Sequence, residues 1–450
     1  MIKAGFSSRV INPPPGVSLM GYFNRRPNTG VLDDVMVRVA LFCDGSGIPA
    51  GIVSFDLVYP FKNLIDAVSS EMKKRTSSVS FENLIFCATH SHTGPDLYDS
   101  EAPFSLDGYV EFLSKVVVDC LVDAHSRMEP ATLRISRTNN NPYAFIRRYW
   151  MKNGKVVTNP GKLNPDIVRP ESEVDPEISV VAVYSKEKTE IIGMLANICN
   201  HTDTIGGNLV SADWPGVLEK EMRALVKGTP TVITLVGASG NVNHFNVSNN
   251  DCQTCPAEAE MIGKGYAGIL SGILAKAENI DDGIVSASSV MVEARKRIIS
   301  REEVSVARAF IAKAGAQSTG KEFTSEELAQ GNEAVLCKFA EMLVTFSEKE
   351  AGKKVLLPVK SISIGGKFAI CSLPGEPFNQ IGTAIKGKSS FKYTFIATNA
   401  MDACGYIPMK ECFGRGGYET LPVPGGGLET DTADKLIEAA SGLLTKEELR

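Results

Sequence analysis

Short apolar runs alternate along the chain with longer segments in which apolar residues recur every three or four positions. Runs of the first kind that end in Gly, Pro, Asn, Asp or Ser are typical of strands, and the longer segments are typical of amphipathic helices. The predicted strands fall within residues 50–60, 82–95, 190–203, 231–243, 368–376 and 393–406. Because predicted helices lie between these strands, the pattern indicates an α/β fold.

The predicted helices cover residues 62–75, 216–227, 257–278 and 325–350, and a last helix begins at about Thr432. Thr324 and Glu327 have the spacing of a capping box at the start of the fourth helix. Residues 137–177 are rich in Asn, Pro and charge, so we expect long loops there. No domain boundary is visible, and residues 1–450 are therefore predicted to form a single domain.

The charge balance excludes partners that need a strong basic field. The chain has 47 basic and 52 acidic side chains, a formal charge of −5, which disfavours nucleic acid. No apolar run approaches the ~18 residues of a spanning helix, so no transmembrane segment is expected. The N-terminus has no secretory signal, so we expect a cytoplasmic protein unless such a signal has been removed. Nothing in the sequence indicates the oligomeric state.

The ten cysteines are scattered, and several lie in apolar stretches, as Cys87, Cys199 and Cys371 do. This placement is typical of buried free thiols in a reducing compartment. Cys252 and Cys255 form one C-x-x-C, but no second cysteine pair or histidine pair completes a zinc site. We interpret them as two loop thiols, with a redox or metal site as the alternative.

Three of the five histidines follow predicted strands in a way that suggests a metal site. His90 and His92 form an H-x-H after an apolar run, and alternate residues of a strand point the same way. Imidazole suits Zn²⁺, although H-x-H alone fits two surface histidines equally well. His201 follows another predicted strand. Since ligands gather outside the carboxyl ends of strands in open α/β sheets, the three histidines predict one metal site.

The remaining polar candidates are less specific. His125 lies near the end of an amphipathic helix and is assigned no catalytic role, whereas His244, in an Asn-rich loop, is a second-tier candidate. Glu376 follows a predicted strand and would complete a hydrolytic zinc set with two histidines, or it could begin the next helix as an acid that complements the helix dipole. Tyr406 could face the site or the core.

Several fragments together resemble the neutral, or non-lysosomal, ceramidases, and they occur in that family's order. The fragments are ATHSHTGP (88–95), NHTDT followed by SADWPG (200–216), LVGASGNVN (235–243), LPGEPF (373–378) and GYIPMKECFGRGGYE (405–419), with MGYFNRR (20–26), VRVALFCDG (37–45) and SFDL (54–57) before them. The resemblance implies an α/β catalytic domain with mixed β-sheets flanked by helices. It also implies a zinc-dependent amidase.

The same resemblance implies a role for individual residues. His90, His201 and Glu376 match zinc ligands for one Zn²⁺ per chain, and Tyr406 matches a tyrosine close to the metal. The next three matches concern catalysis. His92 matches a histidine that exchanges protons or polarises the substrate, Tyr418 a second active-site tyrosine, and Arg147 a substrate-side arginine, for which Arg148 is the alternative.

Two departures from the family pattern bear on the substrate. The chain ends soon after the last motif, where ceramidases continue into an immunoglobulin-like domain. Asn243 stands where some members have a serine proposed to act in catalysis, which disfavours a serine nucleophile. Asp213 could orient a ligand histidine or begin the following helix. No helix has the basic, aromatic face of a membrane-docking element, so a soluble or small substrate is favoured over membrane ceramide.

The leading hypothesis is a metal-dependent hydrolase in which metal-activated water cleaves an amide bond of a small or acyl-amide substrate. A second hypothesis keeps the metal but makes the protein a lactone hydrolase or a lyase acting on a sugar-derived compound. A third is a non-catalytic binding protein with the same fold. The barrel amidohydrolases also begin with H-x-H on a strand, but eight regular strand–helix units are not evident here.

Overall fold

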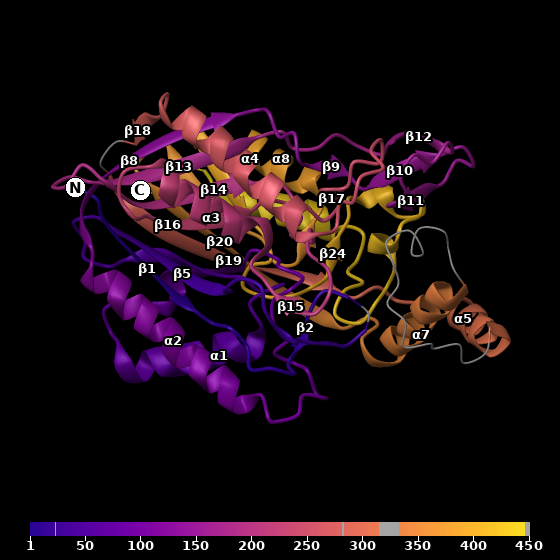
Figure 1. Cartoon of the computed structure of the whole chain (residues 1–450). Helices are drawn as coiled ribbons and strands as arrows, with labels where there is room; N and C mark the ends of the chain where they lie inside the picture. The colour runs from indigo at the N-terminus through magenta and orange to yellow at the C-terminus, as the bar shows by residue number, and fades with distance from the viewer. Residues whose placement is uncertain (23, 281–282, 315–332, 446–450) are drawn as a thin grey trace.

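Two β-sheets pack face to face, and helices cover their outer faces (Figure 1). The computed structural model describes residues 1–450 except 23, 281–282, 315–332 and 446–450. The larger sheet has nine strands in the order β16-β14-β13-β8-β1-β5-β6-β7, with β18 beside β8. Their bounds are β1 Lys3–Val10, β5 Met36–Cys43, β6 Ala50–Phe55, β7 Leu84–Ala88, β8 Glu129–Thr138, β13 Ile178–Ser185, β14 Ile191–Ile198, β16 Thr231–Val236 and β18 Glu278–Ile280.

The smaller sheet has the order β19-β20-β21-β23. Its strands are β19 Val285–Arg295, β20 Lys354–Ile364, β21 Phe368–Ser372 and β23 Tyr393–Ala397. Both sheets are mixed, because the pairs β6/β7, β14/β16 and β21/β23 are parallel while the other pairs within these sheets are antiparallel. The expected mixed α/β architecture is confirmed.

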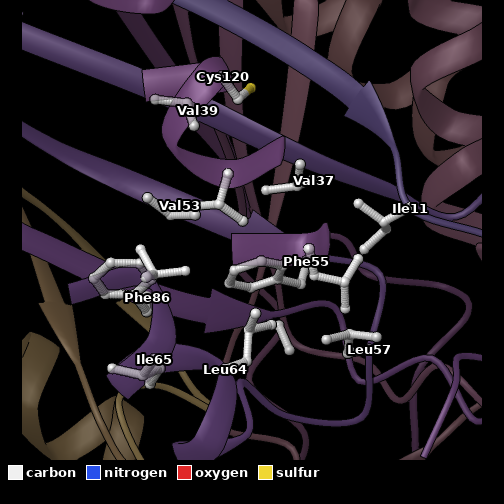
Figure 2. Packing of buried hydrophobic residues seen from close by; sticks show 14 of the residues in the cluster. Ile11, Val37, Val39, Val53, Phe55, Leu57, Leu64, Ile65, Phe86 and Cys120 are labelled. Atoms are coloured by element: carbon white, nitrogen blue, oxygen red, sulfur yellow. The ribbon is translucent and has the colours of Figure 1, made fainter. Parts of the chain in front are cut away.

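The core lies between the two sheets and beneath the helices on either side. Phe42, Leu235 and Phe395 belong to the cluster that fills the space between the sheets. On the outer face of the large sheet, α1 (Lys62–Arg75) and α2 (Asp107–Ser126) cover β5 to β7, as the packing of Phe55 and Leu64 in Figure 2 shows. The remaining outer faces are covered by α3 (Asp213–Leu225) with α4 (Pro256–Leu274) and by α8 (Asn379–Lys388) with α9 (Thr432–Leu443). Alternate residues of each strand therefore enter different apolar layers.

All six predicted strands occur, each shorter than the apolar run that suggested it, and the helices expected at 62–75, 216–227 and 257–278 are α1, α3 and α4. The last helix begins at Thr432 as predicted. The fourth predicted helix is described only as α7 (Glu333–Lys349), and the proposed capping box at Thr324 and Glu327 lies outside the described residues.

The prediction of long loops over 137–177 is only partly confirmed, because short strands interrupt the loops. This region contains β9 (Phe145–Ile146), β10 (Arg148–Met151), β11 (Val156–Thr158) and β12 (Ile167–Pro170). Strands β10 to β12 form a small sheet in the order β11-β10-β12, and β9 pairs with β17 (Val242–Asn243). These strands are too short for an apolar periodicity to reveal them. Strand β9 also has its partner, β17, far along the chain.

A pair of helices, α5 (Arg301–Ala314) and α7, projects at one end of the molecule (Figure 1). In the sequence these helices lie between β19 and β20. All ten cysteines are free thiols, and eight of them are buried, whereas Cys252 is exposed and Cys255 is half-buried. Among the described residues, no helix combines the length and the apolar character that a membrane crossing requires.

A buried ion triad joins the large sheet to α3. The guanidinium of Arg38, on β5, donates to Asp56 Oδ2 at 2.7 Å and to Glu219 Oε2 at 2.6 Å. Asp56 in turn accepts hydrogen bonds from Thr89 Oγ1 and from the Met36 amide. Because Thr89 immediately precedes His90, this triad supports the strand end from which the histidine motif emerges.

Replacing the arginine of this triad should be strongly destabilising. Arg38→Ala leaves the buried Asp56 without its cation and, among the described residues, leaves Glu219 paired with only Arg223, so we expect the free energy of unfolding to fall by about 3–5 kcal/mol. The matched control is Arg75→Ala, which removes a surface pair with Asp119 whose side chains are 38% and 44% exposed. That change should cost no more than about 1 kcal/mol. Denaturant unfolding measures both, and equal losses would contradict the assigned role of the triad.

Candidate active site

A cavity of about 360 Å³ lies where several strand ends meet. Histidines from the loops after β7 and β14 reach it, as do residues from the segments after β21 and β23. All seven residues predicted for the site line this one cavity. They are His90, His92, Arg147, His201, Glu376, Tyr406 and Tyr418.

The first histidine is aimed by an unusual backbone conformation. His90 has a φ of 63°, in the left-handed region that residues other than glycine rarely adopt. Its Nδ1 lies 2.8 Å from the carbonyl oxygen of Val58, an acceptor, so Nδ1 carries the proton and Nε2 is left for the cavity. A strained residue with a fixed tautomer is typical of a site where orientation matters more than stability.

Hydrogen bonds tie together the loops that carry the other two histidines. The His92 amide donates to Thr202 O at 3.2 Å, and the hydroxyl of Thr202 donates to Thr89 O. The backbone of His201 is held separately, because the indole N–H of Trp214 donates to His201 O at 2.8 Å. The ends of β7 and β14 are therefore fixed relative to each other although about 110 residues separate them.

Glu376 and Tyr406 are placed side by side by a short parallel pair of strands. In β22 (Glu376–Pro377) and β24 (Tyr406–Ile407), Glu376 is directly opposite Tyr406. The close approach of these two segments depends on Gly375, which has a φ of 60°. Any other residue would place a Cβ 2.5 Å from Gly405 O. The P-G-E motif thus brings the carboxylate close to the tyrosine.

The donor atoms in the cavity fit a metal ion. His90 Nε2 lies 3.3 Å from His92 Nε2 and 3.3 Å from Glu376 Oε2, which matches the edge of about 3.4 Å in a tetrahedron of ligands around Zn²⁺. Ring nitrogens of His90, His92 and His201 all lie within 4.8 Å of one another. His201 Nδ1 and Glu376 Oε2 are buried and make no hydrogen bond. This buried three-histidine group could bind a metal ion.

The protonation states also suit metal binding. Burial, reinforced by the neighbouring His90, lowers the pKa of both His92 and His201 well below the usual histidine value. Burial would also lower the pKa of His90, but the Glu376 carboxylate outweighs it and leaves that pKa raised. Neutral imidazoles are the ligand form, so two of the three histidines are already deprotonated at neutral pH.

The structure separates the two adjacent arginines. Arg147 lines the cavity and lies over the rings of Tyr406 and Tyr418, at 5.1 and 5.4 Å. Arg148 instead pairs with Glu171 at 2.5 Å and with Glu419 at 2.7 Å. Of the two alternatives, Arg147 is therefore the one at the site.

Glu419 anchors both arginines and was missed in the sequence. Its carboxylate is fully buried, and it accepts from Arg147 Nε at 3.0 Å, from Arg148, and from Thr158 Oγ1 at 2.7 Å. Burial would raise its pKa, but the two guanidinium groups outweigh burial and lower it. Its neighbour Tyr418 stacks on Phe339 of α7, with ring centroids 6.4 Å apart.

The other residues considered in the sequence have different places. His125 is in the last turn of α2, and His244 is buried with Nε2 2.5 Å from Gln253 O; neither lines the cavity. Asn243 does line it. Asp213 begins α3 and accepts hydrogen bonds from the amides of Thr204 and Ile205. It therefore fixes the backbone of the loop after His201, and among the described residues it makes no bond to that imidazole.

Four further polar residues line the cavity and were not predicted: Tyr22, Tyr59, Asn159 and Asp203. Asp203 follows His201 by two residues, and this closeness to a candidate ligand is the signal that could have indicated it. Tyr22 lies within a fragment that carries the family resemblance but has no neighbouring chemical motif. Asn159 gave no signal in the sequence.

Comparison with known proteins gives a structural match but no match in sequence. No family model matches the chain, and no curated protein sequence does either. The neutral ceramidase from Pseudomonas aeruginosa superposes with a TM-score of 0.71 at 18% identity, over 98% of this chain and 74% of that one. A second structure, a ceramidase complexed with C2, gives 0.72 at 17% identity, over 98% and 75%. The chain therefore has a neutral-ceramidase-like fold over nearly its whole length.

Proposed function

We propose that this protein is a metal-dependent hydrolase that cleaves an amide (N-acyl) bond, and that the whole chain forms one catalytic unit. The observation that carries the proposal is the convergence of three histidines and a carboxylate on one buried cavity. The fold shared with two ceramidase structures supports amide hydrolysis over other metal chemistry. Fold likeness alone would not carry it, since one fold supports many activities.

We assign the metal to His90, His201 and Glu376, with Tyr406 close to it, and Zn²⁺ is the ion that this donor set favours. A bound Zn²⁺ would supply Lewis acidity, which activates water and polarises the substrate carbonyl. The chain's own contribution is to hold these donors buried and in a fixed arrangement.

His92 is the proposed general base and acid. A neutral imidazole next to the proposed metal ligand His90 can accept a proton from the attacking water. The water oxygen bonds to the carbonyl carbon, the C–N bond breaks, and the same proton is delivered to the leaving nitrogen. Arg147 and Tyr418 donate hydrogen bonds to the carbonyl oxygen as negative charge develops on it.

The cavity favours a small or soluble substrate. Its volume of about 360 Å³ is near the lower end of the range for small-molecule sites, which is about 300–1,000 Å³. The lining combines apolar side chains such as Phe339, Met342 and Val423 with the polar Asn159 and Asp203. Such a lining suits a compact amide with one apolar and one polar part, rather than two long hydrocarbon chains.

A substrate panel tests the reaction class. The zinc-loaded protein is assayed on N-acyl amides with short and long acyl chains, on lactones and on glycosides. We expect amine release from short-chain amides, with kcat/KM falling as the acyl chain outgrows the cavity. Activity confined to lactones or glycosides would replace amide hydrolysis with the lactonase or lyase alternative. Absence of turnover on every class by the loaded protein would favour a binding protein.

Metal content should separate ligands from the acid–base residue. We expect about one zinc per chain in the wild type, at least about tenfold weaker binding in His201→Ala and Glu376→Gln, and retained zinc in His92→Ala with much lower activity. His125→Ala is the matched control and should change neither. Elemental analysis after dialysis against a weak chelator measures the zinc. Zinc loss in His92→Ala equal to that in His201→Ala would make His92 a ligand.

The tyrosine stacked on Phe339 should act in the transition state. Because its hydroxyl is assigned to the developing oxyanion, Tyr418→Phe should lower kcat by about 10²–10³ and leave KM nearly unchanged. Tyr98→Phe, at a position 54% exposed and outside the cavity lining, serves as the control. Steady-state kinetics on the best amide of the panel provide the measurement. An unchanged kcat would exclude the hydroxyl from catalysis.

A further inference from the structure

The N-terminal segment around Gly21 forms one side of the space that holds the His92 ring. Gly21 has a φ of +113°, and a Cβ at this position would lie 2.6 Å from His92 Cγ. The ring of Tyr22 packs edge-on against the imidazole, with centroids 5.4 Å apart at 81°. Only glycine lets the backbone approach this closely, so the segment is built against the histidine.

Arg26 locks this segment to the backbone of the histidine. Its guanidinium donates to the carbonyl oxygens of Met20, at 2.9 Å, and of His92. It also donates to Gly207 O at 2.8 Å and lies 4.1 Å above the ring of Tyr22. One buried cation thus joins the N-terminal segment to the loops after β7 and β14, and it fixes where the Tyr22 ring can lie.

The carboxylate of Asp203 lies next to Nδ1 of the His92 imidazole. The hydroxyl of Tyr22 donates to Asp203 Oδ1, and His92 Nδ1 lies 3.5 Å from the same oxygen. His92 Nδ1 is buried and makes no hydrogen bond, while Nε2 lies on the side of His90. The carboxylate is the acceptor next to Nδ1, and in free enzymes such contacts are often longer than in the working complex.

We propose that Asp203, held in place by the Tyr22 hydroxyl, is a positioning residue that keeps the His92 ring oriented with the proton on Nδ1 and with Nε2 toward the reacting atoms. This inference rests on the proposed hydrolase function. A histidine that transfers protons through one nitrogen needs the other nitrogen held by an acceptor, or it turns and presents the wrong tautomer. Tyr22 contributes by fixing the carboxylate, and Gly21 by closing off ring rotation.

The rival role for these two residues is direct contact with the substrate, because both also line the cavity. The two roles predict different kinetics. Loss of a substrate contact that is equal in the ground and transition states raises KM, whereas loss of orientation at His92 lowers kcat. The split between kcat and KM therefore decides between them.

The kinetic experiment uses Asp203→Asn and Tyr22→Phe in the full-length zinc-loaded protein. We expect kcat to fall by about 10²–10⁴ in Asp203→Asn and by about tenfold in Tyr22→Phe, with KM within about threefold and zinc content unchanged. Tyr109→Phe is the matched control, because it removes a buried hydroxyl that donates to Ile11 O far from the cavity. A raised KM with unchanged kcat would overturn the positioning role.

An independent measurement keeps this inference distinct from the proposed function. Histidine-selective ¹⁵N labelling gives few signals, since the chain has five histidines, and His92→Ala assigns the one of interest. In the wild type we expect the His92 tautomer protonated at Nδ1, and in Asp203→Asn a shift toward protonation at Nε2. Identical spectra in the two proteins would overturn the proposal. The expected shift in a protein that hydrolyses no amide would retain the positioning role and reject the reaction.

Discussion

One buried amide, Asn197, holds the two sheets in the register on which the site depends. From the end of β14, its Nδ2 donates to the carbonyl oxygens of Leu235 and Ile396, both at 2.8 Å, and its Oδ1 accepts from the Ile396 amide at 3.0 Å. A buried amide with all these bonds satisfied joins β14 and β16 of the large sheet to β23 of the small one. An apolar contact could slide along this interface, whereas the two directional bonds to Ile396 permit one alignment of the sheets only. The loops that follow these strands then meet, with Gly240 donating to Pro377 O at 2.9 Å and Thr398 to Val236 O at 3.0 Å.

The sequence alone could predict those residues of the candidate site that follow directly after a predicted strand. The H-x-H motif and His201 each follow a strand end, which suffices to predict that they meet. The structure brings the two imidazoles of the motif together by the left-handed backbone of His90, after β7 has ended, and not by strand alternation. The fit between Glu376 and Tyr406 could not be derived this way, because it depends on the parallel pairing of β22 and β24, each two residues long. Family resemblance supplied those two residues, and geometry now gives the physical reason for their proximity.

What the sequence left open depends on long-range contacts. Arg147 and Arg148 are adjacent, and both reach Glu419. Only their other contacts distinguish them: Arg147 lies over the rings of Tyr406 and Tyr418 in the cavity, whereas Arg148 pairs with Glu171. Asp203 and Tyr22 meet across 181 residues. The strands within 137–177 are only two to four residues long, which is why composition alone suggested loops. Six strands of the two main sheets were predicted because each carries its own apolar pattern. Site residues were predictable where they directly follow such a strand.

The balance of charge in the cavity explains why its histidines and carboxylates suit a cation. Glu376 and Asp203 line the cavity with negative charge, and the positive charge of Arg147 is already shared with the buried Glu419. Among the described residues, His90 is the group next to Glu376 that can carry a positive charge. Burial would lower the pKa of His90, but the Glu376 carboxylate outweighs burial and raises it. A divalent cation at this place would neutralise the carboxylate and take Nε2 of His90 as a ligand, because a metal ion and a proton compete for the same nitrogen. The neutral His92 and His201 add donor atoms without adding charge. The buried negative charge that destabilises the empty site would therefore favour the binding of a cation there.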